Sequence, residues 1–196
     1  MNELNSCINY IPVIRENPNH INISSSWGNI PTIIKDIIVR FNVNTKCALE
    51  FGVEYGYSTS ALACYFDKVI GVDTFVGDVH SGQKSNHLEQ TKTNLINYPN
   101  IELIQSDCEN FIQNDDRRCD LIHIDIVHTY NETFECGDWS VRHADVVIFH
   151  DTISFPEINR VCQDLSKKYD LAWFNYSESY GLGILVNKNR LKVESL

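Results

Sequence analysis

The feature that most constrains the fold of this chain is a repeated alternation of short apolar runs and segments with helical periodicity. Isoleucines and Phe41 recur at helical spacing over residues 30–41, with Pro31 suited to a first helical turn. Five apolar runs follow, separated by helix-like segments: 46–51, 68–73, 101–107, 119–125 and 145–149. Near-continuous apolar strands separated by helices are typical of a parallel sheet covered on both faces.

The end of the chain departs from this alternation. A helical pattern over about 156–168 leads to two strand-like runs, DLAWFNY (170–176) and GLGILVN (181–187), with only SESY between them. We therefore expect the last strand to pair antiparallel. The sequence predicts an α/β fold: a single doubly wound, mostly parallel seven-stranded sheet of Rossmann-like type. We expect residues 1–29 to be an irregular lead-in, 30–190 the domain and 191–196 a tail, since 196 residues suit one core.

Composition disfavours several classes of protein. Apolar residues make up 43% and charged residues 21%, which is typical of a soluble globular protein, and no apolar run approaches a membrane span. The net charge of −10 comes without any block of lysine and arginine, so we expect neither a nucleic-acid nor a membrane partner. Seven cysteines without a CxxC pair, and no signal-peptide pattern, favour a reducing cytoplasm.

Acidic residues gather at the carboxyl ends of the predicted strands. Glu50, Asp73, Asp107 and Asp125 close four successive strands, and ligands of such sheets bind outside these ends. Asp73 is placed to accept hydrogen bonds from a ribose diol, and Asp107 one from an adenine amino group. After the first of these strands, GVEYG carries glycines that let the backbone approach a ligand closely.

This order of strand ends resembles the class I S-adenosylmethionine-dependent methyltransferases. The segments VDTFVGDVHSG, LIHIDIVHTYNETFECGDW, VVIFHDT and YGLGILV look like the branch related to sugar and macrolide O-methyltransferases and to glycosyltransferase-associated methyltransferases. The similarity spans roughly residues 25–187. Two departures stand out. Ile126 replaces the glycine that usually follows the HID aspartate, and His143 and Ala144 replace a glycine pair before the VVIFHD strand.

The resemblance implies roles for individual residues around S-adenosylmethionine. It places Glu50, Gly52 and Gly56 on the methionine side, with Ser58 near the carboxylate, and Asp125 within the cofactor pocket. It gives Asp73 the ribose hydroxyls, Phe75 or Thr74 the wall of the adenine pocket, and Asp107 and Cys108 the adenine edge.

The two strand ends HID and FHD raise the question of a metal and a base. Asp125 and Asp151 offer oxygen ligands for Mg²⁺ or another divalent metal, with His150 as a third candidate, although its imidazole favours transition metals. His128 stands at the offset where related enzymes place a general base, and an ordinary histidine pKa near 6.5 suits that role. His123, within a buried strand, is predicted to be a core histidine.

The leading functional hypothesis is O-methylation of a sugar or other small polar hydroxyl acceptor by S-adenosylmethionine, with metal assistance and a homodimer both left open. Residues 24–27 and the loop after Asp73, which carries Asp78 and His80, are expected to govern the choice of acceptor. Two alternatives remain. A metal-dependent hydrolase would use Asp125, His128, His150 and Asp151, and a nucleotide-binding module would keep the cofactor pocket without turnover.

Overall fold

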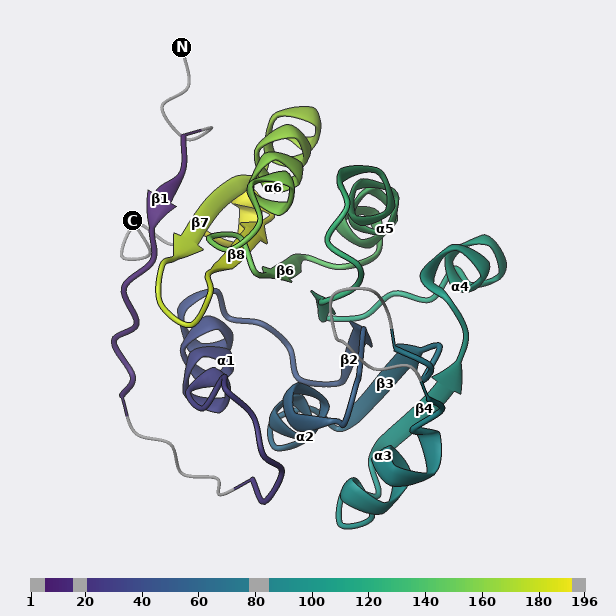
Figure 1. Cartoon of the computed structure of the whole chain (residues 1–196). Coiled ribbons are helices and arrows are strands. Elements are labelled where there is room, and N and C mark those ends of the chain that lie inside the picture. Colours follow the sequence, from purple (N-terminus) through teal and green to yellow (C-terminus); the bar gives the residue numbers. More distant parts are fainter. Residues whose placement is uncertain (1–5, 16–20, 78–84, 192–196) are drawn as a thin grey trace.

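A computed structural model describes residues 6–15, 21–77 and 85–191 of the chain. Its centre is one sheet of eight strands in the order β1-β7-β8-β6-β5-β2-β3-β4 (Figure 1). The strands are β1 (Ile8–Asn9), β2 (Cys47–Phe51), β3 (Lys68–Asp73), β4 (Ile101–Gln105), β5 (Leu121–Ile124), β6 (Val146–His150), β7 (Ala172–Tyr176) and β8 (Leu182–Val186). All pairings are parallel except those of β8 with β6 and β7, which confirms the predicted antiparallel last strand.

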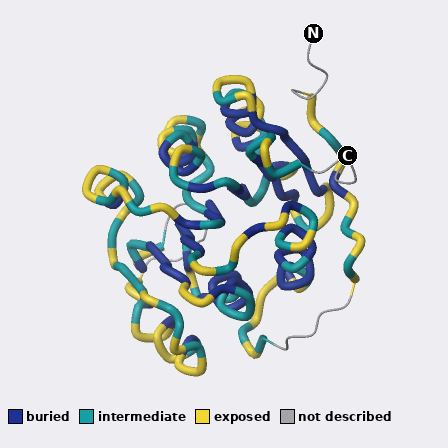
Figure 2. Tube along the Cα trace, turned by 180° about the vertical axis from the view of Figure 1, so that it is seen from behind, coloured by how far each residue is buried: buried dark blue, intermediate teal, exposed yellow. Residues whose placement is uncertain are grey.

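Helices cover both faces of the sheet. They are α1 (Ile30–Arg40), α2 (Tyr57–Ala63), α3 (Leu88–Asn94), α4 (Cys108–Asn114), α5 (Tyr130–His143) and α6 (Pro156–Tyr169), followed by a short 3₁₀ helix, η2 (Lys188–Arg190). Side chains of α1 and α2 pack in one apolar cluster, while those of α4, α5 and α6 pack in another. The strands between these clusters are largely buried (Figure 2). No helix in the described ranges is long and apolar enough to cross a membrane.

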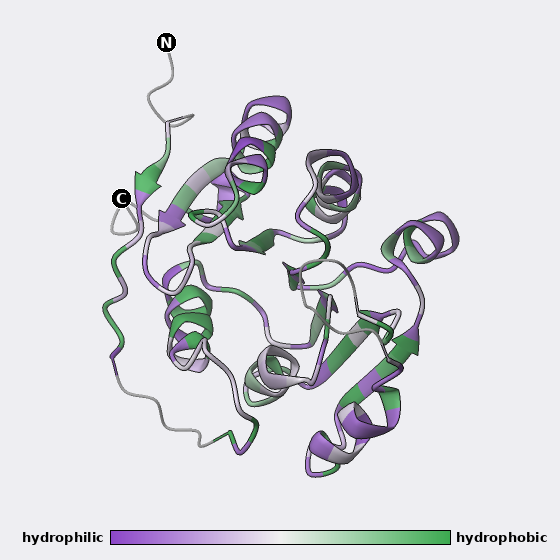
Figure 3. Cartoon of the chain, in the orientation of Figure 1, coloured by the Kyte–Doolittle hydropathy of each residue, from purple (hydrophilic) through white to green (hydrophobic). Residues whose placement is uncertain are grey.

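Helix α1 illustrates how the sequence pattern produces the core. Ile30, Ile33, Ile34 and Ile37 recur on one side of the helix and are at most 2% exposed. The isoleucines give α1 its hydrophobic colour over much of its length in Figure 3. Burying one such side chain contributes about 1.5–3 kcal/mol. The four together anchor α1 beside the sheet.

The prediction of seven strands is one strand short, because the lead-in contributes β1. Ile8 and Asn9 pair in parallel with Phe174 and Asn175 of β7. A two-residue strand has no alternation long enough to be recognised in a sequence. Beyond it, Tyr10 donates a hydrogen bond to the buried carboxylate of Asp36 in α1. The lead-in is therefore bound to the domain at both the sheet and a helix.

The strand order reverses between β2 and β5. From β2 the chain proceeds outward through β3 and β4, and it then returns to the other side of β2 to form β5 and β6. In open α/β sheets, ligands bind in the crevice at such a reversal. The topology therefore predicts a ligand site at the loops that follow β2 and β5.

Candidate active site

A cavity of about 1020 Å³ lies at the carboxyl ends of strands β2 to β6. This volume is at the upper end of the range usual for small-molecule sites, about 300–1,000 Å³. Most of the residues predicted for the site line it: Gly52, Ser58, Asp73, Thr74, Asp107, Cys108, Asp125, His128, His150 and Asp151. The strand ends that the sequence singled out therefore meet around one space.

Gly52 allows the loops after β2 and β5 to come together. Its φ is +87°, and a Cβ at this position would lie 1.8 Å from the backbone oxygen of Asp125. Only glycine fits both this backbone conformation and this contact. The close approach brings the loop after β2 directly beside the loop that carries Asp125 and His128.

Asp73 holds the loop after β2 in place. One carboxylate oxygen accepts hydrogen bonds from the backbone N–H groups of Val53 (2.7 Å) and Glu54 (2.8 Å). The other accepts one from the N–H of Phe75 (2.7 Å). Asp73 lines the cavity, so its carboxylate joins the end of β3 to the loop after β2 at the wall of the cavity.

The adenine-side candidates have local structural partners as well. Asp107 caps α4, accepting hydrogen bonds from the backbone N–H of Asn110 (2.7 Å) and from its side-chain amide (2.6 Å). Cys108 begins α4 and lines the cavity beside it. Ser58, in the first turn of α2, is 8% exposed and lines the same cavity.

Three predicted cofactor residues do not line the cavity. Glu50 is fully buried, where it pairs with Nδ1 of His123 (2.8 Å) and accepts a hydrogen bond from Thr59. A Cβ on Gly56 would meet Leu95 rather than the cavity, and Phe75 is fully buried and packs on His87. These three residues lie behind the side chains that line the cavity. His123 is buried in the core, as predicted, and its Nδ1 forms a hydrogen bond with Glu50.

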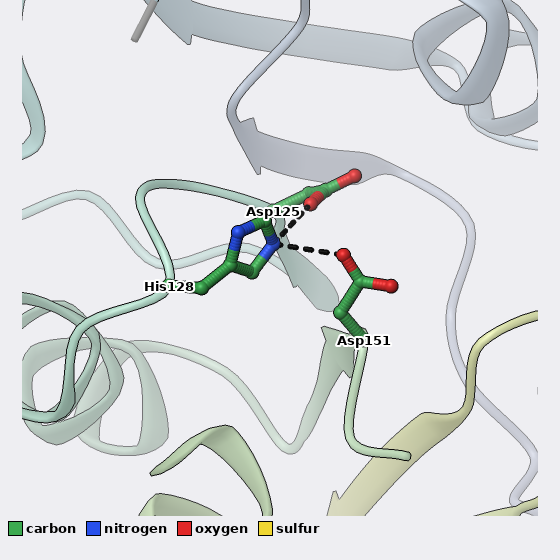
Figure 4. Close-up of side chains that lie close together, drawn as sticks. All are labelled: Asp125, His128 and Asp151. Atoms are coloured by element: carbon green, nitrogen blue, oxygen red, sulfur yellow. Dashed lines mark ion pairs between the residues drawn. The ribbon is translucent and has the colours of Figure 1, made fainter. Parts of the chain in front are cut away.

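Asp125, His128 and Asp151 form a compact group (Figure 4). Nε2 of His128 lies 2.9 Å from Oδ2 of Asp151 and 3.6 Å from Oδ1 of Asp125. One ligand atom from each side chain lies within 4.8 Å of the other two, a spacing that could hold a metal ion. Asp151 has a φ of +63°, which is uncommon for a residue other than glycine and is often found at functional sites.

The group does not include His150, whose role as a third metal ligand stays a prediction. Its Nδ1 lies 3.0 Å from Oδ2 of Asp125, whereas His128 faces Oδ1 of the same carboxylate. The distance from Nδ1 of His150 to Oδ2 of Asp151 is 3.9 Å. Its ring stacks on Trp27. His128, expected to be a base, occupies the third position instead because the loop after β5 brings its imidazole between the two carboxylates.

The two carboxylates determine the protonation of the two histidines. Burial acts to lower the pKa of His128, but its hydrogen bonds to Asp125 and Asp151 outweigh burial and raise the pKa to about 9. Burial likewise opposes a charge on His150, yet the charge of Asp125 raises its pKa. For Asp125, burial favours the neutral acid, but the charge of His150 and the hydrogen bond of His128 hold its pKa well below the usual value.

Other predicted features vary in their placement. Ile126, which replaces the family's usual glycine, lines the cavity, as do residues 24–27 of the lead-in. Asp78 and His80 lie outside the described residues. Phe155 was not predicted to belong to the site, yet its ring stacks on His128 at 4.1 Å between centroids and 6° between planes. Its position before Pro156 gave no sign of this role.

The cavity lies where the strand order reverses, and acidic strand ends and the turn at Gly52 line it. This arrangement is typical of Rossmann-like α/β proteins, which bind ligands at that place. Within that class, a family model described as a methyltransferase domain matches residues 49–152, more than half of the chain. The chain belongs to this methyltransferase family. No curated protein matches the sequence.

Solved structures share the fold at low sequence identity. The O-methyltransferase NovP is 16% identical, with a TM-score of 0.64 over 82% of this chain and 78% of that one. TomG from Streptomyces achromogenes, an O-methyltransferase of tomaymycin synthesis solved with S-adenosylmethionine, is 13% identical, with a TM-score of 0.59 over 89% and 91%. An rRNA methylase from Streptococcus thermophilus is 14% identical, with a TM-score of 0.53 over 82% and 96%. The fold is that of the class I S-adenosylmethionine-dependent methyltransferases.

Proposed function

We propose that this protein transfers the methyl group of S-adenosylmethionine to a hydroxyl group of a small polar acceptor such as a sugar. The observation that carries the proposal is a single cavity that joins two sets of residues. Gly52, Asp73 and Asp107 lie at the ends of β2, β3 and β4, and the Asp125–His128–Asp151 group lies beyond β5 and β6. A cofactor and an acceptor could therefore occupy one space.

The cofactor side suits S-adenosylmethionine in its polar groups. The hydroxyl of Ser58 and the carboxylates of Asp73 and Asp107 line the cavity, and a carboxylate oxygen has room for more than one hydrogen bond. When bound, the cofactor would supply a methyl group on a positively charged sulfur. The carboxylates would favour that charge, and the solved structure of TomG contains this cofactor.

On the acceptor side, the chain must orient a hydroxyl and accept its proton. Asp125 and Asp151 can accept a hydrogen bond from it, and His128 can take up the proton once its own proton has been lost. Because the pKa of His128 is raised to about 9, this imidazole is mainly protonated at neutral pH when only the carboxylates surround it. A base role for His128 thus predicts a rate that rises with pH.

The same three side chains fit a divalent cation by their donor atoms, two carboxylates and one imidazole. A bound cation would favour the ionised form of an acceptor hydroxyl. It would also require neutral His128, so metal binding should release a proton.

The charge of the cavity supports a neutral or cationic acceptor over a phosphorylated one. Eight carboxylates line it: Glu54, Asp73, Asp107, Glu109, Asp125, Glu132, Glu135 and Asp151. Histidines are the only basic side chains among the described lining residues. Such a lining repels phosphate groups. It favours a sugar or amino sugar over an RNA, although an rRNA methylase shares the fold.

The proposal is tested by methyl transfer from isotopically labelled S-adenosylmethionine to matched sets of acceptors. Each set contains a sugar, the corresponding amino sugar and the corresponding sugar phosphate, and an rRNA fragment serves as a further acceptor. We expect label in the ether of a neutral or amino sugar and none in the phosphate or RNA. Label found only in RNA or in phosphorylated acceptors would contradict the assigned acceptor class.

A further inference from the structure

Trp27 lies outside the segment matched by the methyltransferase family model, yet it contacts the active site directly. Its indole stacks on the imidazole of His150, with 3.8 Å between ring centroids and 15° between planes. Trp27 is 4% exposed and lines the cavity. A buried aromatic ring in face-to-face contact limits both the tilt and the rotation of its partner.

The orientation of the His150 ring decides whether its Nδ1 can reach the carboxylate of Asp125. Nδ1 lies 3.0 Å from Oδ2 of Asp125, and since a carboxylate can only accept, the imidazole donates this hydrogen bond. Tyr180, in the turn before β8, presents its ring edge-on to His150 at 6.2 Å and 89°. Trp27 on one face and Tyr180 at a right angle leave His150 little freedom to turn away from Asp125.

The segment that carries Trp27 is itself fixed to the far end of the domain. The side-chain amide of Asn29 donates to the hydroxyl of Tyr176 (2.7 Å), and the hydroxyl of Ser179 donates to the oxygen of Asn29 (3.1 Å). The backbone N–H of Trp27 donates to the hydroxyl of Ser25 (3.0 Å). The two contacts of Asn29 join the lead-in to the end of β7 and to the turn before β8, the turn that also carries Tyr180.

We propose that Trp27 is a positioning residue of the active site, which holds the imidazole of His150 in the plane where Nδ1 meets Asp125. His150 in turn fixes one oxygen of Asp125 and leaves the other directed toward His128 (3.6 Å). The catalytic consequence rests on the proposed methyl transfer. The orientation of His150 does not depend on that proposal, and it can be measured without an acceptor.

The test compares Trp27→Leu, which removes the ring, with Trp27→Phe, which keeps a ring to stack on His150. Side-chain ¹H–¹⁵N spectra of protein labelled with ¹⁵N-histidine report the Nδ1–H group of His150, assigned by its loss in His150→Gln. We expect its exchange with water to quicken by about tenfold or more in Trp27→Leu and to stay near the wild-type rate in Trp27→Phe.

The chain offers a matched internal control. His143 stacks on Trp139 at 4.0 Å and 12°, and its Nδ1 lies 2.7 Å from the backbone oxygen of Trp139. Its signal should be the same in both Trp27 variants, which shows that the fold is intact. With His143 unchanged, a wild-type exchange rate for His150 in Trp27→Leu would overturn the proposal, as would equal acceleration in Trp27→Phe.

Steady-state kinetics of the Trp27 variants test whether the orientation of His150 affects catalysis. Misplacing a catalytic group by a fraction of an ångström lowers rate rather than affinity, so Trp27→Leu should reduce kcat roughly tenfold, with Trp27→Phe restoring most of it. The Kd for S-adenosylhomocysteine should stay within about twofold in both variants, since Gly52, Asp73 and Asp107 on the proposed cofactor side follow β2, β3 and β4. A rise in this Kd with unchanged kcat would contradict the positioning role. If wild-type protein fails to bind S-adenosylhomocysteine, the proposed function fails, and the histidine spectra still decide the positional claim.

Discussion

Replacing Asp73 by alanine should weaken both the fold and cofactor binding, because its carboxylate satisfies three backbone N–H groups. The N–H of Glu54 belongs to an exposed residue and can turn to water, whereas Val53 and Phe75 are at most 2% exposed. Two buried donors left without partners cost about 1–3 kcal/mol each. Water admitted through the cavity would satisfy part of this, so we expect a loss of about 2–4 kcal/mol.

For a chain of this length, each kcal/mol shifts Tm by roughly 2–4 °C, so Asp73→Ala should lower Tm by roughly 5–15 °C in circular dichroism melts. Asp116→Ala, at an exposed position, is the matched control and should change Tm by no more than about 2 °C. Calorimetry should also show binding of S-adenosylhomocysteine weakened by roughly tenfold or more. A wild-type Tm would refute the role of Asp73 in the loop, and wild-type affinity would remove it from the cofactor site.

Three further predictions follow from the geometry. Gly52→Ala should cost at least about 3 kcal/mol or prevent folding, since its Cβ would collide with the backbone oxygen of Asp125; a wild-type melting curve would contradict this contact. The pKa of His128 is raised from 6.5 to about 9, so its stabilising contribution, roughly 3 kcal/mol, should be complete below pH 6.5 and disappear as pH rises through about 9. Denaturant unfolding across this range should show that loss in the wild type and a flatter profile in His128→Gln, and equal profiles would disprove the pairing. Mn²⁺ should raise Tm and release protons in the wild type but not in Asp151→Asn, and chelation should lower activity; an unchanged wild-type Tm with millimolar Mn²⁺ would exclude the metal.

The sheet could be predicted from the sequence because its strands are apolar and separated by periodic segments. The run CALEF became β2 and the run VVIF the body of β6, and the last residue of each strand, Phe51 and His150, lines the cavity. Parallel pairing brings carboxyl ends together whatever the loops do. This is why most of the predicted site residues line one cavity.

The partners of individual side chains could not be predicted in the same way. Asp151 faces His128 because its backbone adopts a left-handed conformation, and nothing in the letters FHD indicates that φ. The sequence therefore could not decide which of His128 and His150 completes the group with Asp125. Trp27 is more than a hundred residues from His150, so their stacking depends on the tertiary fold. Glu50 is predicted on the cofactor side, and its pairing with His123 inside the core likewise depends on the tertiary fold.

Isothermal titration of the wild-type protein with S-adenosylhomocysteine measures whether the cavity binds this product, as it is proposed to bind the parent cofactor. NAD serves as the control, since it shares the adenosine and ribose groups but not the methionine portion. We predict saturable binding of S-adenosylhomocysteine with a Kd of about 1–100 μM and binding of NAD at least about tenfold weaker. Folded protein that binds no S-adenosylhomocysteine, or binds NAD more tightly, would contradict the assignment as an S-adenosylmethionine-dependent methyltransferase.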